Sequence, residues 1–139
     1  MLKGMEAQQS SVVVCEAYET LREGLELILR NLYRVTAVNH VADLFPILED
    51  GRPDLLIFDV DGQPEPYEAL ARVRQFHQTL RILLIAGEFS FDQQIAAVRL
   101  SNVSFLTKPF SVEHFLEKVQ TLIQGYSGSP KRYVVQIAV

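Results

Sequence analysis

The sequence predicts an α/β fold in which five parallel strands form one doubly wound sheet with helices on both faces. Short apolar runs alternate with longer amphipathic segments along the chain, which is the pattern of repeated β/α units. Two runs, 55–58 and 82–85, are apolar at every position, so both faces of each strand are expected to be covered. Right-handed crossovers between such strands place helices on both sides of the sheet.

Composition indicates one ordinary domain. Of the 139 residues, 48% are hydrophobic and 22% charged, which suits a soluble domain with a core of its own. The net charge of −4 argues against direct contact with nucleic acid. No apolar stretch is long enough to cross a bilayer, and residues 1–10 lack the apolar run of a signal peptide. With a single cysteine, Cys15, the chain suits a reducing compartment, and we expect a cytoplasmic protein without a membrane partner.

The chain opens with a β/α unit and a second strand. Residues 12–15 are apolar and mostly β-branched, which favours a strand. From 19 to about 31, apolar residues recur at helical spacing. Residues 35–38 are expected to form a second, weaker strand.

A second helix is expected at 40–50, where Pro46 either sits in the first turn or kinks the helix. Gly51 and Pro53 end this segment, and the apolar run 55–58 follows as the third strand.

The second half of the chain continues the alternation. Residues 67–78 form a plausible helix with Pro66 near its start, and 82–85 is the fourth strand. Ser90 and Gln93 have the spacing of a capping box, which opens the next helix. That helix carries Phe91, Ile95 and Val98 on one face, which we expect to lie in the core.

Residues 103–106 are the fifth strand, and Ser111 caps the last helix. The apolar stripe of this helix is also expected to be core, and it consists of Val112, Phe115, Leu116, Val119, Leu122 and Ile123. Five β/α units of this kind predict a flavodoxin-like sheet with strand order 2-1-3-4-5.

Three segments follow from this reading. Residues 1–10 are expected to be a flexible N-terminus, 11–124 the folded domain, and 125–139 a hinge with a β-prone tail. The tail could be an added edge strand, an oligomer contact or the start of a further domain, and the sequence leaves these alternatives open.

Polar residues follow the strands at the edge of the sheet where ligands bind in such folds. Glu16 follows the first strand, Asp59 the third and Lys108 the fifth, while Ala86 and Gly87 come at the end of the fourth. Because strands 1 and 3 are central neighbours, Glu16 and Asp59 are expected to converge, with Lys108 in reach. Carboxylates beside an ammonium suit Mg²⁺ and a phosphoryl group, and a carboxylate there can itself be the nucleophile that forms an acyl phosphate.

Two stretches carry a resemblance to a known family. They are 53–59, which reads Pro-Asp-Leu-Leu-Ile-Phe-Asp, and 97–110, which ends in Lys-Pro-Phe. From 11 to 123 the chain resembles the receiver domain of bacterial two-component response regulators. The resemblance implies that Asp59 accepts a phosphoryl group from a histidine kinase or phosphotransfer protein. It also implies that Lys108, before a cis Lys-Pro bond, contacts this group, and that Phe105 reorients when the domain switches.

The chain departs from the family pattern at three places. The family usually has two adjacent acids after strand 1, whereas this chain has Glu16 and Ala17. Ala86 stands where the family has a Ser or Thr hydroxyl, and the loop 60–66 is one residue shorter than the common family pattern. A lost hydrogen bond to a charged group is worth about 1.5–3 kcal/mol, which is enough to shift a two-state switch about ten- to a hundred-fold.

Asp61 is expected to compensate at the metal site. We hypothesise that its carboxylate replaces the acid that is lost at Ala17, so that Glu16, Asp59 and Asp61 hold Mg²⁺. The alternative is that Asp61 faces water in its loop.

Two other functions stay open. One is a receiver that binds a partner without phosphorylation, which Ala17 and Ala86 favour. The other is a haloacid dehalogenase-like phosphatase, because 56–62 reads Leu-Ile-Phe-Asp-Val-Asp-Gly. Position argues against the phosphatase, since that motif belongs on the first strand of a longer chain and Gln63 stands where Thr is expected.

The resemblance also implies partners. We expect a signalling domain that is not an enzyme beyond self-dephosphorylation, and that either acts on a downstream protein or belongs to a larger regulator with its own effector domain. The fourth helix, fifth strand and fifth helix should form the partner face, or a homodimer contact, as an alternative to the tail. The residues expected on that face are Gln94, Arg99, Ser104, Glu113 and Glu117.

Overall fold

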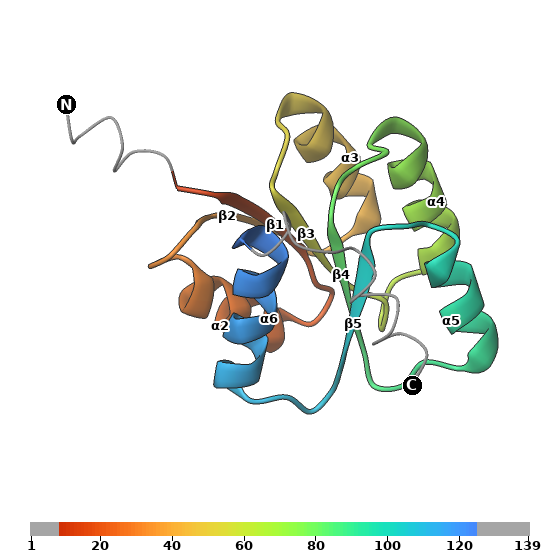
Figure 1. Ribbon diagram of the computed structural model, residues 1–139. Helices are drawn as coiled ribbons and strands as arrows, with labels where there is room; N and C mark the ends of the chain where they lie inside the picture. Colours follow the sequence, from red (N-terminus) through yellow and green to blue (C-terminus); the bar gives the residue numbers. More distant parts are fainter. Residues whose placement is uncertain (1–8, 125–139) are drawn as a thin grey trace.

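Five strands and five helices alternate along the chain in the computed structural model, which describes residues 9–124 (Figure 1). The strands are β1 (Ser11–Cys15), β2 (Arg34–Val38), β3 (Leu55–Asp59), β4 (Ile82–Ala86) and β5 (Val103–Thr107). The helices are α2 (Glu19–Leu29), α3 (Val41–Asp50), α4 (Pro66–Phe76), α5 (Phe91–Val98) and α6 (Val112–Gln124). All strand pairs are parallel, in the order β2-β1-β3-β4-β5, which confirms the predicted fold class and strand order. The expectations for 1–8 and 125–139 lie outside the described residues.

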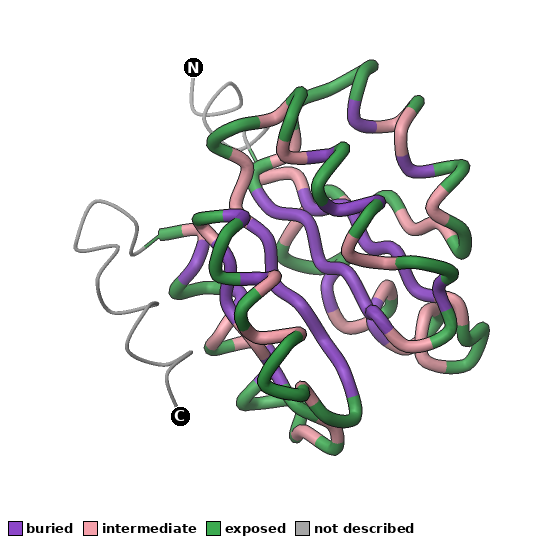
Figure 2. Tube along the Cα trace, turned by 90° about the vertical axis from the view of Figure 1, so that its right-hand side faces the viewer, coloured by how far each residue is buried: buried purple, intermediate pink, exposed green. Residues whose placement is uncertain are grey.

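The sheet separates two apolar layers. Helices α3, α4 and α5 cover one face, and α2 and α6 cover the other (Figure 1). Every residue of β3 and β4 is buried, and Figure 2 shows buried segments running through the centre of the molecule. The uninterrupted apolar runs of the sequence therefore reflect two covered faces. This arrangement fixes the strands from both sides and holds their carboxyl ends in register.

Pairing continues past the strand ends at the edge that carries the polar residues. The Glu16 amide donates to Val38 O, the Val60 amide to Ile85 O, and the Lys108 amide to Ala86 O. The residues that follow β1, β3 and β5 thus leave the sheet from fixed backbone positions.

Pro46 lies inside α3 and not in its first turn, so that alternative was wrong. Proline removes the hydrogen bond to the carbonyl four residues earlier, here Ala42. Pro46 and Ala42 are both exposed, so water can satisfy that carbonyl.

The expected core face of α5 is wrong, although the capping box of Ser90 and Gln93 is confirmed by both of its hydrogen bonds. The side chains expected in the core are exposed instead, at 75% for Phe91, 39% for Ile95 and 42% for Val98. Ala97 is the buried residue of the helix, because its small side chain lets α5 approach the sheet. The helix is thus rotated relative to its apolar stripe. In α6, Val112 is likewise 52% exposed.

Ser104 does not lie on the expected partner face. It is 2% exposed and pairs in register with Leu83, which belongs to the apolar layer beneath α2 and α6. In a strand covered on both faces, alternate residues point to opposite layers, so Ser104 is buried while its neighbour Phe105 faces α5. Among the described residues, no helix is long and apolar enough to cross a membrane.

Candidate phosphoacceptor site

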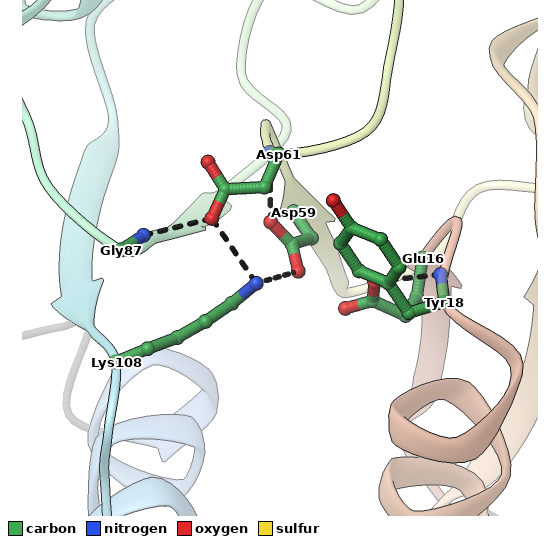
Figure 3. Close-up of polar contacts among 6 residues, drawn as sticks. All are labelled: Glu16, Tyr18, Asp59, Asp61, Gly87 and Lys108. Atoms are coloured by element: carbon green, nitrogen blue, oxygen red, sulfur yellow. Dashed lines mark hydrogen bonds and ion pairs between the residues drawn. The ribbon is translucent and has the colours of Figure 1, made fainter.

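Three strand ends bring Glu16, Asp59 and Lys108 together (Figure 3). Asp59 is the last residue of β3 and is 1% exposed, and Glu16 after β1 is fully buried. The Lys108 ammonium reaches in from the end of β5, where its Nζ atom is 2.6 Å from Asp59 Oδ2. A buried carboxylate is stable only with such partners, so the arrangement is that of a functional site built on a rigid sheet.

Lys108 is held by two carboxylates. Its Nζ atom also lies 3.2 Å from Asp61 Oδ2, and the Lys108–Pro109 peptide bond is cis, as the resemblance implies. Burial alone lowers the pKa of the ammonium, but the contacts with Asp59 and Asp61 outweigh it and raise the pKa above its ordinary value. Lys108 is therefore charged at neutral pH.

Glu16 presents a protonated carboxyl to Asp59. Burial, followed by the interaction with Asp59, raises the pKa of Glu16 from 4.5 to about 8, although the Tyr18 amide, which donates to Glu16 Oε2 at 3.1 Å, opposes this. The other oxygen, Glu16 Oε1, is buried without a hydrogen-bond partner. Protonation of Glu16 relieves the repulsion between the two carboxyl groups.

Asp61 turns away from Glu16. Its Oδ2 atom accepts a hydrogen bond from the Gly87 amide at 2.8 Å, besides its contact with Lys108 (Figure 3). Its own amide donates to Asp59 Oδ1 at 2.9 Å. The carboxylate thus bridges the loop after β3 and the loop after β4.

A divalent cation fits the remaining carboxylate pair. The unpartnered Glu16 Oε1 and the adjacent Asp59 carboxylate are hard oxygen donors, and Mg²⁺ is commonly held by one or two carboxylates together with water and phosphate. In the part of the chain that the structure describes, no group of three potential metal-ligating side chains is gathered, and the expected set of Glu16, Asp59 and Asp61 stays a prediction.

The loop after β3 is shaped by Gly62 and Gln63. Gly62 has a φ of +81°, and a Cβ there would lie 3.0 Å from the Ala17 Cβ and 3.2 Å from the Tyr18 ring. Gln63 is 7% exposed; its Nε2 atom donates to Asn39 O at 2.9 Å, and its Oε1 atom accepts from the Val41 amide at 3.3 Å. Gln63 thus anchors the loop to the start of α3.

Ala86 and Phe105, the two residues expected to take part in switching, lie in the neighbouring strands β4 and β5. Ala86 is fully buried, and its methyl group offers no hydrogen bond to the site. Phe105 is half-buried and packs edge-on against Phe89 in the loop after β4, with ring centroids 4.6 Å apart. A movement of that loop would therefore change the packing of the Phe105 ring.

Sequence reasoning missed Tyr18 as a site residue and gave Gly87 no role. Lys108 Nζ lies 5.3 Å from the centroid of the Tyr18 ring, which is within the range of a cation–π contact. A signal existed only for Gly87: a residue without a side chain at the end of a strand leaves its amide accessible.

Comparisons with known proteins agree with this geometry. A family model described as the response regulator receiver domain matches residues 12–120. Response regulator MprA of Mycobacterium leprae is 27% identical over 111 residues, which are 76% of this chain and 46% of that protein. The chain thus spans about half the length of the curated relatives it matches.

Solved structures agree as well. A response regulator from Chloroflexus aurantiacus is 27% identical with a TM-score of 0.71, and covers 84% of this chain and 98% of its own. Chemotaxis protein CheY4 of Vibrio cholerae matches the fold with a TM-score of 0.76 at 21% identity, over 83% of this chain and 99% of its own. The matches favour a receiver domain over the haloacid dehalogenase-like phosphatase considered from the sequence.

Proposed function

Because this chain belongs to the response regulator receiver domain family of two-component signalling, we propose that Asp59 accepts a phosphoryl group. The observation that carries the proposal is the 2.6 Å contact between the buried Asp59 carboxylate and Lys108. Lys108 lies beside this carboxylate, where its positive charge can neutralise an incoming phosphoryl group.

The transfer is an exchange of bonds at phosphorus. An Asp59 carboxylate oxygen attacks the phosphorus of a phosphohistidine on a kinase or phosphotransfer protein. The new O–P bond forms as the P–N bond breaks, and the imidazole leaves and takes up a proton from water. The product is an acyl phosphate whose charge Lys108 and the Gly87 amide can bind.

Receiver domains generally bind Mg²⁺ at the phosphorylation site. In this chain Glu16 and Asp59 would hold the ion. When bound, it would supply positive charge that neutralises the phosphoryl oxygens.

The proposed partners follow from the family. Response regulators interact with histidine kinases and effector domains. We propose a histidine kinase or phosphotransfer protein as the donor, and a downstream protein or effector domain as the receiver of the signal, in the cytoplasm. The exposed apolar residues of α5, Phe91, Ile95 and Val98, support α5, β5 and α6 as the partner face, or as the contact of a homodimer.

The test is acyl phosphate formation. The protein is incubated with acetyl phosphate and Mg²⁺, and intact mass is measured before and after treatment with hydroxylamine, which cleaves acyl phosphates. We expect wild type to gain one labile phosphoryl group, Asp59→Asn to gain none, and Asp92→Asn, which alters an exposed acid of α5, to behave as wild type. A wild-type protein that stays unmodified at millimolar reagent would instead support a phosphorylation-independent interaction domain.

A further inference from the structure

The carboxylate of Asp61 already occupies the donors that a phosphoryl group on Asp59 would need. Gly87 donates its amide to Asp61 Oδ2 at 2.8 Å, and Lys108 Nζ lies 3.2 Å from the same oxygen. The same Lys108 is in contact with Asp59 at 2.6 Å. Two donors from two loops therefore converge on one anionic oxygen beside the phosphoacceptor.

A backbone N–H and an ammonium that point to one place form an anion site. A phosphoryl group attached to Asp59 carries negative oxygens that must find donors within reach of that carboxylate. The Gly87 amide is an important donor for such a phosphoryl group, because Ala86 brings no hydroxyl to the site. Asp61 and the phosphoryl group cannot both use these donors, since two anions at one place repel each other.

We propose that Asp61 is an internal substitute for the phosphoryl group. Before phosphorylation its carboxylate holds Gly87 and Lys108, and it must leave them when Asp59 is modified. The first half of the proposal concerns the unmodified domain alone, and the second half rests on the proposed function of Asp59. The structure assigns Asp61 a position beside the donors, and not beside Glu16, where a metal ligand would lie (Figure 3).

The position of Asp61 also explains how the loop after β4 is placed in a site without the usual hydroxyl. The Gly87 amide is tied to Asp61, and two residues later Phe89 packs against Phe105. In the unmodified domain, the Asp61 carboxylate thus holds the loop after β4 through the Gly87 amide, as the phosphoryl oxygens would after phosphorylation. Phosphorylation then exchanges one anion for another, and the structural change is expected to be small.

The first experiment observes the Gly87 amide by NMR in the unmodified protein, with EDTA present. Wild type is compared with Asp61→Ala, Asp61→Asn and Glu88→Gln, which removes one negative charge from an exposed neighbour of Gly87. We expect the Gly87 amide proton to move upfield and exchange faster in Asp61→Ala, to move less in Asp61→Asn, and to stay in place in Glu88→Gln. An unchanged Gly87 signal in Asp61→Ala overturns the proposal.

The second experiment titrates beryllofluoride at saturating Mg²⁺, with the Gly87 amide as readout. Asp61→Ala should bind beryllofluoride about tenfold more tightly than wild type, which corresponds to roughly 1.4 kcal/mol. Beryllofluoride should also return the Gly87 proton of Asp61→Ala downfield, and Glu88→Gln should bind as wild type does.

Weaker binding of both beryllofluoride and Mg²⁺ in Asp61→Ala would overturn the proposal and make Asp61 a metal ligand. If wild type and all variants fail to bind beryllofluoride, the function of Asp59 and the release of Asp61 both fall. In that case the Gly87 signal in EDTA still decides whether Asp61 holds the donors.

Discussion

Replacing Glu16 by Gln should stabilise the metal-free protein at alkaline pH. Glu16 is fully buried beside the Asp59 carboxylate, and its Oε1 atom has no hydrogen-bond partner. Ionisation of Glu16 therefore places a further negative charge directly beside Asp59. The Gln amide keeps the shape of the protonated carboxyl, can donate to Asp59, and never ionises.

The sign and size follow from the pKa of Glu16. Burial and Asp59 raise it from 4.5 to about 8 in the folded state. A raised pKa contributes stability that is fully present below the unfolded value and is lost as the pH rises through the folded value, here between 4.5 and about 8. Each unit corresponds to about 1.4 kcal/mol. Since the ionisation of Glu16 is coupled to the neighbouring Asp59 carboxylate, we expect a loss of about 2–4 kcal/mol in wild type and none of it in Glu16→Gln.

Urea unfolding with EDTA, followed by circular dichroism at about pH 5, 7 and 9, measures this difference. The two proteins should be similar near pH 5, and Glu16→Gln should become the more stable one as the pH rises, with the gap levelling off above pH 8. Glu49→Gln, which alters an exposed acid of α3, should follow wild type at each pH. A gap between Glu16→Gln and wild type that stays constant from pH 5 to 9 would refute the raised pKa.

Three further substitutions test the site and its supports by urea unfolding. Lys108→Met should lower the unfolding free energy by about 1–3 kcal/mol, because the buried Asp59 carboxylate loses its ion pair. In an Asp59→Asn background the same substitution should lower it much less, and equal losses in both backgrounds would contradict this. Gly62→Ala should lower the free energy of unfolding by about 1–3 kcal/mol, because Gly62 has a φ of +81° and crowded surroundings. The control Gly24→Ala, inside α2 with open space around it, should raise the free energy of unfolding by up to about 1 kcal/mol. A change of the same sign in both variants would contradict this expectation. Ser90→Ala should cost about 1 kcal/mol and speed amide exchange at the start of α5, and unchanged exchange of the Gln93 amide would count against the capping role.

Most of the fold follows from patterns that do not depend on tertiary detail. The runs at 55–58 and 82–85 are apolar at every position because β3 and β4 are covered on both faces, so composition alone reveals their place in the sheet. The capping box at Ser90 and the cap at Ser111 are local hydrogen bonds between residues three apart, and both are present.

What the sequence could not supply is the orientation set by packing. The apolar face of α5 points outward because Ala97, and not Phe91, fits against the sheet. At the site, the strand order placed Asp59 and Lys108 at one edge, but the direction of the Asp61 side chain depends on the Gly87 amide. A glycine after β4 indicates an accessible amide, but the sequence does not show which side chain that amide binds.

The small apolar contact between α5 and the rest of the domain affects where local unfolding begins. An eight-residue helix that buries Ala97 leaves little apolar contact to resist its opening, whereas β3 and β4 are buried throughout. Free energies of local unfolding should therefore form a hierarchy, with α5 and the loop before it opening far more often than the sheet. Hydrogen exchange should resolve α5 as a separate unit that opens while the sheet stays folded.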